Sequence, residues 1–168
     1  MKKVYCPIKG ELSLELYEEI EIYGKIFTGR DAVLPKIATL YQEGRLSEFG
    51  IDLAGSVIFH TAVSDAGIGP TSSNKFDIES TIPILSKAGV KLHLGKGALK
   101  KDTIDALKEN QSYFAITPPT SALFSSKILS QRVVAFSDEG IEALHELEVA
   151  RIPAIIAAAN GKTVFGYL

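Results

Sequence analysis

The chain has 168 residues, of which 46% are hydrophobic and 23% are charged, and its formal net charge at pH 7 is −2. This size suits one domain with its own core, so the sequence predicts a single domain over residues 1–168. The charge gives no electrostatic reason to expect nucleic acid or an anionic membrane as a partner, and no apolar run is long enough to span a bilayer. The first residues do not resemble a signal peptide, which favours a cytoplasmic location.

The first half of the chain alternates between strand-like and helix-like periods. Residues 20–27 alternate apolar and polar side chains, which predicts a strand with one buried face. Apolar residues at helical spacing predict a helix over residues 34–41 that ends at Gly44. Residues 54–61 are typical of a short buried strand. Residues 64–74 are rich in glycine, serine and threonine, which predicts a loop.

The second half continues this alternation and ends in a hairpin signal around Asn160-Gly161. The expected elements are, in chain order, a helix over 78–85 closing at Gly89, a strand over 90–94, a helix over 101–109, a strand over 113–116, a helix over 121–128, a strand over 133–136, a helix over 139–144 and a hairpin over 155–165. Strands alternating with helices, with a terminal hairpin, predict an α/β fold with a mixed sheet.

Cysteine and histidine usage predicts no metal site on this chain. Cys6 is the only cysteine, so it cannot form an internal disulfide or ligate an iron–sulfur cluster by itself, and it fits a small buried hydrophobe. His60, His93 and His145 lack the spacing of a zinc-binding helix. His60 fits a hydrogen-bonded histidine of the core or its rim. His93 is expected to face outward because it alternates with two leucines, and His145 fits the end of a helix.

Three short segments lie where a predicted strand gives way to a loop or helix, which is where α/β folds usually bind ligands. In Thr28-Gly29-Arg30-Asp31 the glycine permits a tight turn, and the guanidinium of Arg30 is suited to a carboxylate. The alternative is a capping turn in which Arg30 pairs with a surface acid.

The second segment, Gly67-Ile68-Gly69-Pro70-Thr71-Ser72-Ser73-Asn74-Lys75, combines glycines, hydroxyls and a cation, and fits an anion-binding cradle. It is neither a Rossmann fingerprint nor a P-loop, and the alternative is a polar capped loop. The third, Gly95-Lys96-Gly97, leaves a lysine free to point at a ligand, although it also fits an ordinary turn.

In this order and spacing, the segments resemble those of a known family of hydro-lyases. Residues 24–31 (Gly-Lys-Ile-Phe-Thr-Gly-Arg-Asp), Gly69-Pro70-Thr71-Ser72 followed by Asp77, and Gly95-Lys96-Gly97 resemble the β subunit, or C-terminal domain, of class I fumarases and L-tartrate dehydratases. The resemblance runs from about Leu14 to the end of the chain.

The resemblance implies a swivelling β/β/α domain with a mixed sheet, acting as a β subunit in reversible hydration of fumarate to malate. It implies an α subunit as partner, in an α2β2 assembly, that holds a 4Fe-4S cluster through three cysteines. The ligand would be a small dicarboxylate, bound between the subunits. The site residues implied are Arg30, Lys75, Lys96, Gly69 and Ser72 for substrate binding, and Thr71 and Lys96 for catalysis.

The chain departs from the family pattern at a few positions. Lys75 stands where the family usually has arginine, which keeps the charge but loses the bidentate fork. Residues 59–67 lack the usual Gly-Pro and Lys-Pro-Gly elements, and Thr117-Pro118-Pro119-Thr120 replaces a Gly-Gly-Ala-like turn. These departures leave two alternatives open: an L-tartrate dehydratase β subunit, and a non-catalytic anion-binding or scaffold domain of the same fold.

Overall fold

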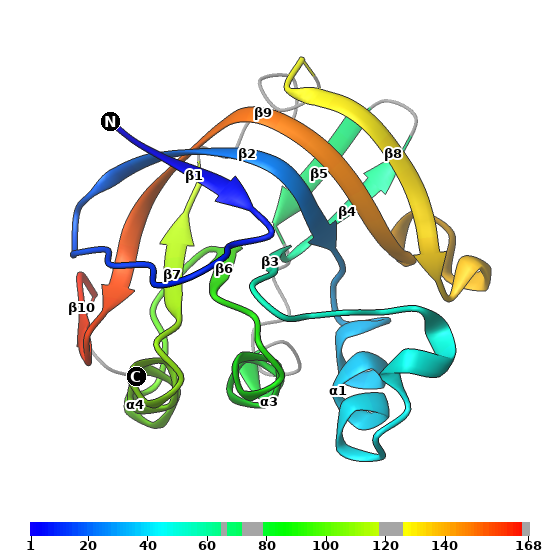
Figure 1. Cartoon of the computed structure of the whole chain (residues 1–168), viewed down its shortest axis with the longest axis horizontal. Coiled ribbons are helices and arrows are strands. Elements are labelled where there is room, and N and C mark those ends of the chain that lie inside the picture. The colour runs from blue at the N-terminus through cyan, green and yellow to red at the C-terminus, as the bar shows by residue number, and fades with distance from the viewer. Residues whose placement is uncertain (65–66, 72–78, 118–125, 166–168) are drawn as a thin grey trace.

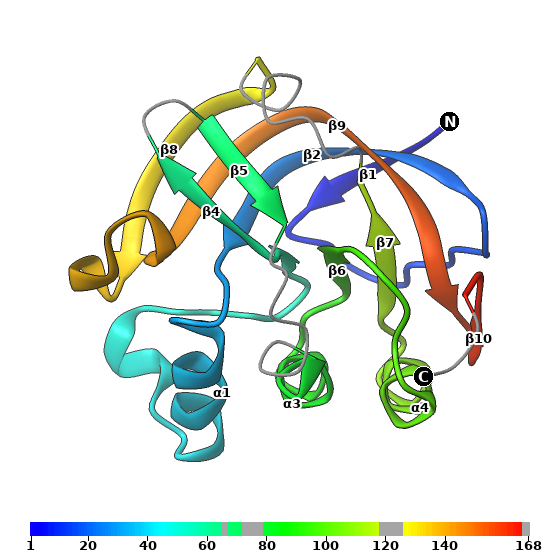
Figure 2. The same cartoon turned by 180° about the vertical axis from the view of Figure 1, so that it is seen from behind.

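The structure, a computed structural model of the chain, describes residues 1–64, 67–71, 79–117 and 126–165. Strongly curved strands arch over a row of helices, α1, α3 and α4 (Figure 1). The reverse view shows a separate two-stranded hairpin, β4–β5, in front of the arch (Figure 2).

The described residues form an eight-stranded sheet and the two-stranded hairpin. The strands of the main sheet are β1 (Lys2–Cys6), β2 (Glu19–Thr28), β3 (Val57–Phe59), β6 (Leu92–Gly95), β7 (Tyr113–Ile116), β8 (Ile128–Ala135), β9 (Leu144–Ala159) and β10 (Lys162–Thr163). The hairpin is β4 (Thr61–Ser64) with β5 (Gly67–Thr71). The helices are α1 (Leu34–Gln42), α3 (Ile82–Lys87) and α4 (Lys101–Glu109), with 3₁₀ segments η1 (Leu46–Phe49) and η2 (Ser137–Glu142).

The main sheet closes on itself. Strands β2, β3, β6 and β7 are parallel neighbours in that order, β9 pairs antiparallel with β7, and β9 also pairs antiparallel with β2. These five strands therefore form a small closed barrel, which leaves no free edge within the ring. The expected α/β fold with a mixed sheet is confirmed.

The barrel interior holds the largest apolar cluster, because alternate residues of each strand point inward. Ile20, Ile22 and Ile26 of β2 are at most 1% exposed and contribute to this cluster. Ile58 lies between the inward-facing Val57 and Phe59, and it packs instead in a second cluster with α1 and α3. Burying both faces of the short parallel strands explains why their sequences are nearly continuous apolar runs.

Most elements expected from periodicity are present, but three expectations were wrong. The strand expected over residues 54–61 ends at Phe59, and the loop expected over residues 64–74 contains β5, which pairs with β4. The helix expected over 139–144 is the 3₁₀ segment η2, and Leu144 already belongs to β9. Residues 121–125 of the helix expected over 121–128 lie outside the described residues, and its last residue, Ile128, is already the first residue of β8.

Candidate functional site

The carboxyl ends of three parallel strands meet at one edge of the barrel and carry the candidate residues. The backbone N–H of Gly29, after β2, donates to the carbonyl of Phe59 at 3.1 Å. The N–H of His60, after β3, donates to the carbonyl of Leu94 in β6 at 2.9 Å. Ligands bind at this end of parallel strands in α/β folds, and we therefore take this edge as the candidate site.

Two of the candidate cations follow these strand ends directly. Arg30 comes immediately after Gly29, and the exposed Lys96 comes immediately after Gly95, the last residue of β6. Because β2 and β6 flank β3 on either side, Arg30 and Lys96 leave the barrel from the same edge. This edge therefore carries two positively charged side chains, and we call it the cationic edge.

The β4–β5 hairpin brings the glycine- and threonine-containing segment to this edge as well. Thr61 follows His60 at the end of β3 and pairs across the hairpin with Thr71, the last residue of β5. Gly69 lies within β5. Ser72 and Lys75 fall outside the described residues, so their role in substrate binding stays a prediction.

Arg30 is partnered within the fold. Its Nε donates to Oε1 of Glu142 at 3.2 Å, with the side chains 25% and 31% exposed. The alternative in which Arg30 pairs with an acid is thus partly realised, yet the pair uses only one of the five guanidinium N–H groups. Among the described residues, Nη1 and Nη2 have no other partner, and they retain the fork that binds carboxylates.

A buried polar chain lies beneath the same edge. His60 Nε2 is 3.3 Å from His93 Nδ1, and His93 Nε2 is 2.8 Å from the hydroxyl oxygen of Ser86 in α3. His60 is 3% exposed, as expected for a hydrogen-bonded core histidine. The expectation that His93 faces outward was wrong, since it is 0% exposed. His93 does point away from the barrel interior, but α3 covers that face.

Burial keeps both rings neutral. Desolvation lowers the pKa of His60 to about 3 and lowers that of His93 well below its usual value, with the neighbouring His60 adding to the effect on His93. His145 is also buried, at 7% exposure, and lies in β9 instead of at a helix end, with Nδ1 2.9 Å from the carbonyl oxygen of Ala143.

We expect the protein to lose stability in mild acid because of this pair. The unfolded chain binds protons at histidine with a pKa near 6.5, whereas the folded chain does not, so stability falls as the pH drops from about 6.5 towards 3. For His60 the loss between pH 8 and pH 5 is about 2 kcal/mol. Urea unfolding of wild type and His60→Gln at both pH values measures it. The difference in free energy of unfolding between wild type and His60→Gln should be smaller at pH 5 than at pH 8. Parallel pH dependences of the two proteins would contradict the expectation.

Two buried hydroxyls at the same end of the barrel lack partners among the described residues. Thr28 is the last residue of β2 and Thr117 directly follows β7, and the Oγ1 atom of each is buried without a hydrogen bond. Unpaired buried hydroxyls are uncommon, and they are consistent with a site that a ligand or partner completes. In the sequence, Thr117 was noted only because the segment Thr117-Pro118-Pro119-Thr120 departs from the family pattern.

Within the described residues, no group of three or more His, Cys, Asp or Glu side chains is placed to hold a metal ion. Burial raises the pKa of the Cys6 thiol to about 12, which keeps it protonated and unsuited as a metal ligand. The described part of the chain therefore does not fit an iron–sulfur cluster. In that same part, no helix combines the length and apolar character needed to cross a membrane.

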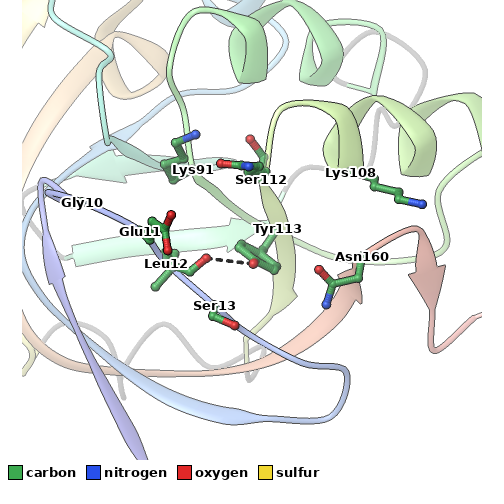
Figure 3. A pocket seen from close by; sticks show the side chains of 10 residues that line it. Gly10, Glu11, Leu12, Ser13, Lys91, Lys108, Ser112, Tyr113 and Asn160 are labelled. Carbon is green, nitrogen blue, oxygen red and sulfur yellow. Dashed lines mark hydrogen bonds between the residues drawn. The ribbon is translucent and has the colours of Figure 1, made fainter.

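A separate pocket of about 280 Å³ lies at the opposite edge of the sheet, next to the amino ends of β6 and β7 (Figure 3). Two of its polar side chains form hydrogen bonds within the fold. The hydroxyl of Tyr113 donates to the carbonyl of Leu12 at 2.9 Å, and Nζ of Lys91 donates to the carbonyl of Asn110 at 3.0 Å. The first bond holds the segment between β1 and β2 against the barrel, and the second ties the start of β6 to the end of α4, so we do not assign this pocket to the candidate site.

The fold is an α/β barrel with a mixed sheet, and its cationic edge lies at the carboxyl ends of parallel strands, where α/β folds usually bind ligands. A family described as "Fumarase C-terminus" matches residues 9–167, and the chain belongs to this family. It is 27% identical over 158 residues to the anaerobic class I fumarate hydratase of Escherichia coli K12 and 25% identical over 157 residues to the aerobic enzyme of that strain, with 89% of this chain covered in each case.

A third relative, fumarate hydratase 2 of Leishmania major, is 27% identical over 165 residues, which cover 93% of this chain. The matched region is only 27% of the length of the two bacterial relatives and 29% of the Leishmania relative. The chain thus corresponds to little more than a quarter of these proteins. The resemblance to the fumarase family noted from the sequence is confirmed.

Proposed function

We propose that this chain is the β subunit of a class I-type hydro-lyase and takes part in the reversible hydration of fumarate to malate. The observation that carries the proposal is the meeting of Arg30, Lys96 and the end of β5 at one edge of the barrel, in a chain of the fumarase family. The proposal includes a cytoplasmic α subunit as partner, which holds a 4Fe-4S cluster, in an α2β2 assembly with the active site between the subunits.

The roles proposed for the residues follow from the charge of the substrate. A dicarboxylate carries about −2 in total, and hydration requires both carboxylates to be fixed so that the proton and the hydroxyl reach the correct carbons. Arg30, Lys75 and Lys96 are proposed to hold these carboxylates, each charged hydrogen bond contributing roughly 1.5–3 kcal/mol. Gly69 and Ser72 would line the same anion-binding segment.

Thr71 is proposed to deliver the proton to the substrate carbon in hydration and to remove it in dehydration. A threonine hydroxyl is a weak base in water, so this role requires nearby positive charge to stabilise its alkoxide. Lys96 is proposed for this purpose, because it leaves the barrel from the edge at which β5 ends. Water supplies the hydroxyl added to the second carbon, and its remaining proton replaces the one that Thr71 gave up. The overall reaction adds one water and neither oxidises nor reduces the substrate.

Two other functions fit specific features of the chain. An L-tartrate dehydratase would use the same cationic edge for a more hydroxylated dicarboxylate, and Lys75 in place of arginine is compatible with a different substrate geometry. A non-catalytic anion-binding or scaffold domain would fit the pairing of Arg30 with Glu142. The first differs from fumarase in its substrate profile and the second in the absence of turnover.

Anaerobic isolation of the chain with its native partner tests the proposal. The complex should be brown and oxygen-labile and should hydrate fumarate, whereas the isolated chain should be inactive. A complex that dehydrates tartrate but does not turn over fumarate would replace the proposed substrate. A colourless complex that binds no dicarboxylate, measured by calorimetry with fumarate and malate, would overturn the enzymatic role.

A further inference from the structure

The ion pair between Arg30 and Glu142 joins residues 112 positions apart in the sequence. The register of the barrel explains how they meet: Thr28, the last residue of β2, pairs with His145 of β9. Arg30 lies two residues beyond Thr28, and Glu142 lies three residues before His145. Closure of the barrel by β9 therefore places the carboxylate of Glu142 beside the guanidinium of Arg30.

The backbone that carries Glu142 is firmly held. Ala143 and Leu144, which follow it, are each 1% exposed, and the N–H of Ala143 donates to the carbonyl of Gly140 at 3.0 Å. At the other end of η2, Phe136 stacks on Phe49 with ring centroids 5.7 Å apart. The side chain of Glu142 thus extends from a backbone that is held in place, in contrast to an acid on a freely exposed loop.

A second ion pair links η2 to α1, and it offers a matched comparison. Nζ of Lys36 lies 2.8 Å from Oε1 of Glu139, and the same ammonium sits 5.2 Å from the centre of the Phe136 ring. Glu139 and Glu142 lie on either side of a kink at Gly140 within η2, and each pairs with a cation. Only Glu142 pairs with a residue of the candidate site.

We infer that Glu142 is a positioning residue, which holds Arg30 through Nε so that Nη1 and Nη2 face the substrate carboxylate. This inference rests on the proposed function. A carboxylate bound at Nε fixes the plane of the guanidinium. Within the described part of the chain nothing occupies Nη1 and Nη2, which together can bind a carboxylate in bidentate fashion. A free arginine would lose its rotational freedom on binding substrate, whereas one held by Glu142 has already lost it.

The alternative role for Glu142 is charge compensation, and the two roles predict opposite signs. If Glu142 only neutralises Arg30, its removal strengthens attraction of the substrate anion and lowers KM. If Glu142 positions Arg30, its removal raises KM. In the complex with its partner, we expect Glu142→Ala to lower kcat/KM for fumarate about 10-fold, chiefly through KM, from the ordering cost of one long side chain.

Conservative and matched variants separate positioning from a general structural effect. Glu142→Gln keeps an oxygen that accepts from Nε and should recover part of the loss, while Glu139→Gln should leave kcat and KM within about 2-fold of wild type. Because the pair is partly exposed, thermal midpoints should change by only about 2–4 °C.

A double-mutant cycle gives the decisive measurement. If Glu142 acts through Arg30, then Glu142→Ala should have little further effect in the Arg30→Ala background. An equal loss in both backgrounds, or a lowered KM in Glu142→Ala, would overturn the inference while leaving the proposed function intact. Absence of fumarate turnover in the wild-type complex would instead overturn the proposed function itself.

Discussion

Arg30→Ala is expected to lower kcat/KM for fumarate about 1,000-fold in the complex with the partner. The variant loses two charge-assisted hydrogen bonds from the guanidinium fork, which together contribute about 4 kcal/mol, or three powers of ten. The folded chain should lose little, because the ion pair with Glu142 is partly exposed and such pairs contribute under about 1 kcal/mol. Steady-state kinetics and urea unfolding measure the two effects separately.

Two further variants make the Arg30 result specific. Arg30→Lys keeps the charge without the planar fork and should recover only part of the activity. Arg45→Ala removes another arginine that pairs with two acids, Glu43 and Glu48, outside the candidate edge, and should leave the rate unchanged. A near-normal rate in Arg30→Ala would remove this residue from the proposed site.

Gly55→Ala should be strongly destabilising, at about 4 kcal/mol, although it adds only one methyl group. Gly55 has a φ of +71°, and a Cβ there would meet the backbone carbonyl oxygen of Ile8. Neither backbone can easily move, because the N–H of Ile8 donates to the carbonyl of Gly55 at 2.7 Å and the N–H of Gly55 donates to that of Gly89 at 2.9 Å. Conformational strain and overpacking each cost roughly 1–3 kcal/mol.

Gly44→Ala is a control with nearly the same backbone angle. Gly44 has a φ of +69°, but a Cβ there would have no atom within 4 Å. It should therefore show the conformational strain alone, about 1 kcal/mol. The difference in thermal midpoint between the two variants, about 10 °C for a chain of this size, reports the steric contact with Ile8. Equal midpoints would show that the segment around Ile8 can shift.

Periodicity predicted the elements whose exposed and buried faces differ clearly. The strand expected over residues 20–27 is β2, and the helix expected over 101–109 coincides with α4. The Asn160-Gly161 hairpin is present between β9 and β10. In the strand and the helix, apolar residues recur at the period of the element, because one face packs on apolar residues and the other meets water or a polar layer. The hairpin was predicted from its Asn-Gly turn instead.

Periodicity failed where pairing with distant strands decides the structure. β9 runs for 16 residues, although Pro153 argues against a central strand. The structure accommodates Pro153 directly after an irregularity in the pairing with β2, where residues 150–151 have no partner in register and Arg151 has a φ of +60°. β5 was missed for a related reason: its glycine-rich sequence has little strand propensity, and it is defined by pairing with β4.

From its sequence alone, the chain is recognisable as an α/β protein whose candidate cations, Arg30 and Lys96, each follow a strand, because local spacing encodes strands, turns and side-chain chemistry. The fold decides which of these strand ends are neighbours, that Arg30 is held by Glu142, and that His93 lies buried under α3. Such contacts join residues far apart in the chain, 112 positions in the case of Arg30 and Glu142. No local pattern specifies them, since they depend on how the barrel closes and what covers each face.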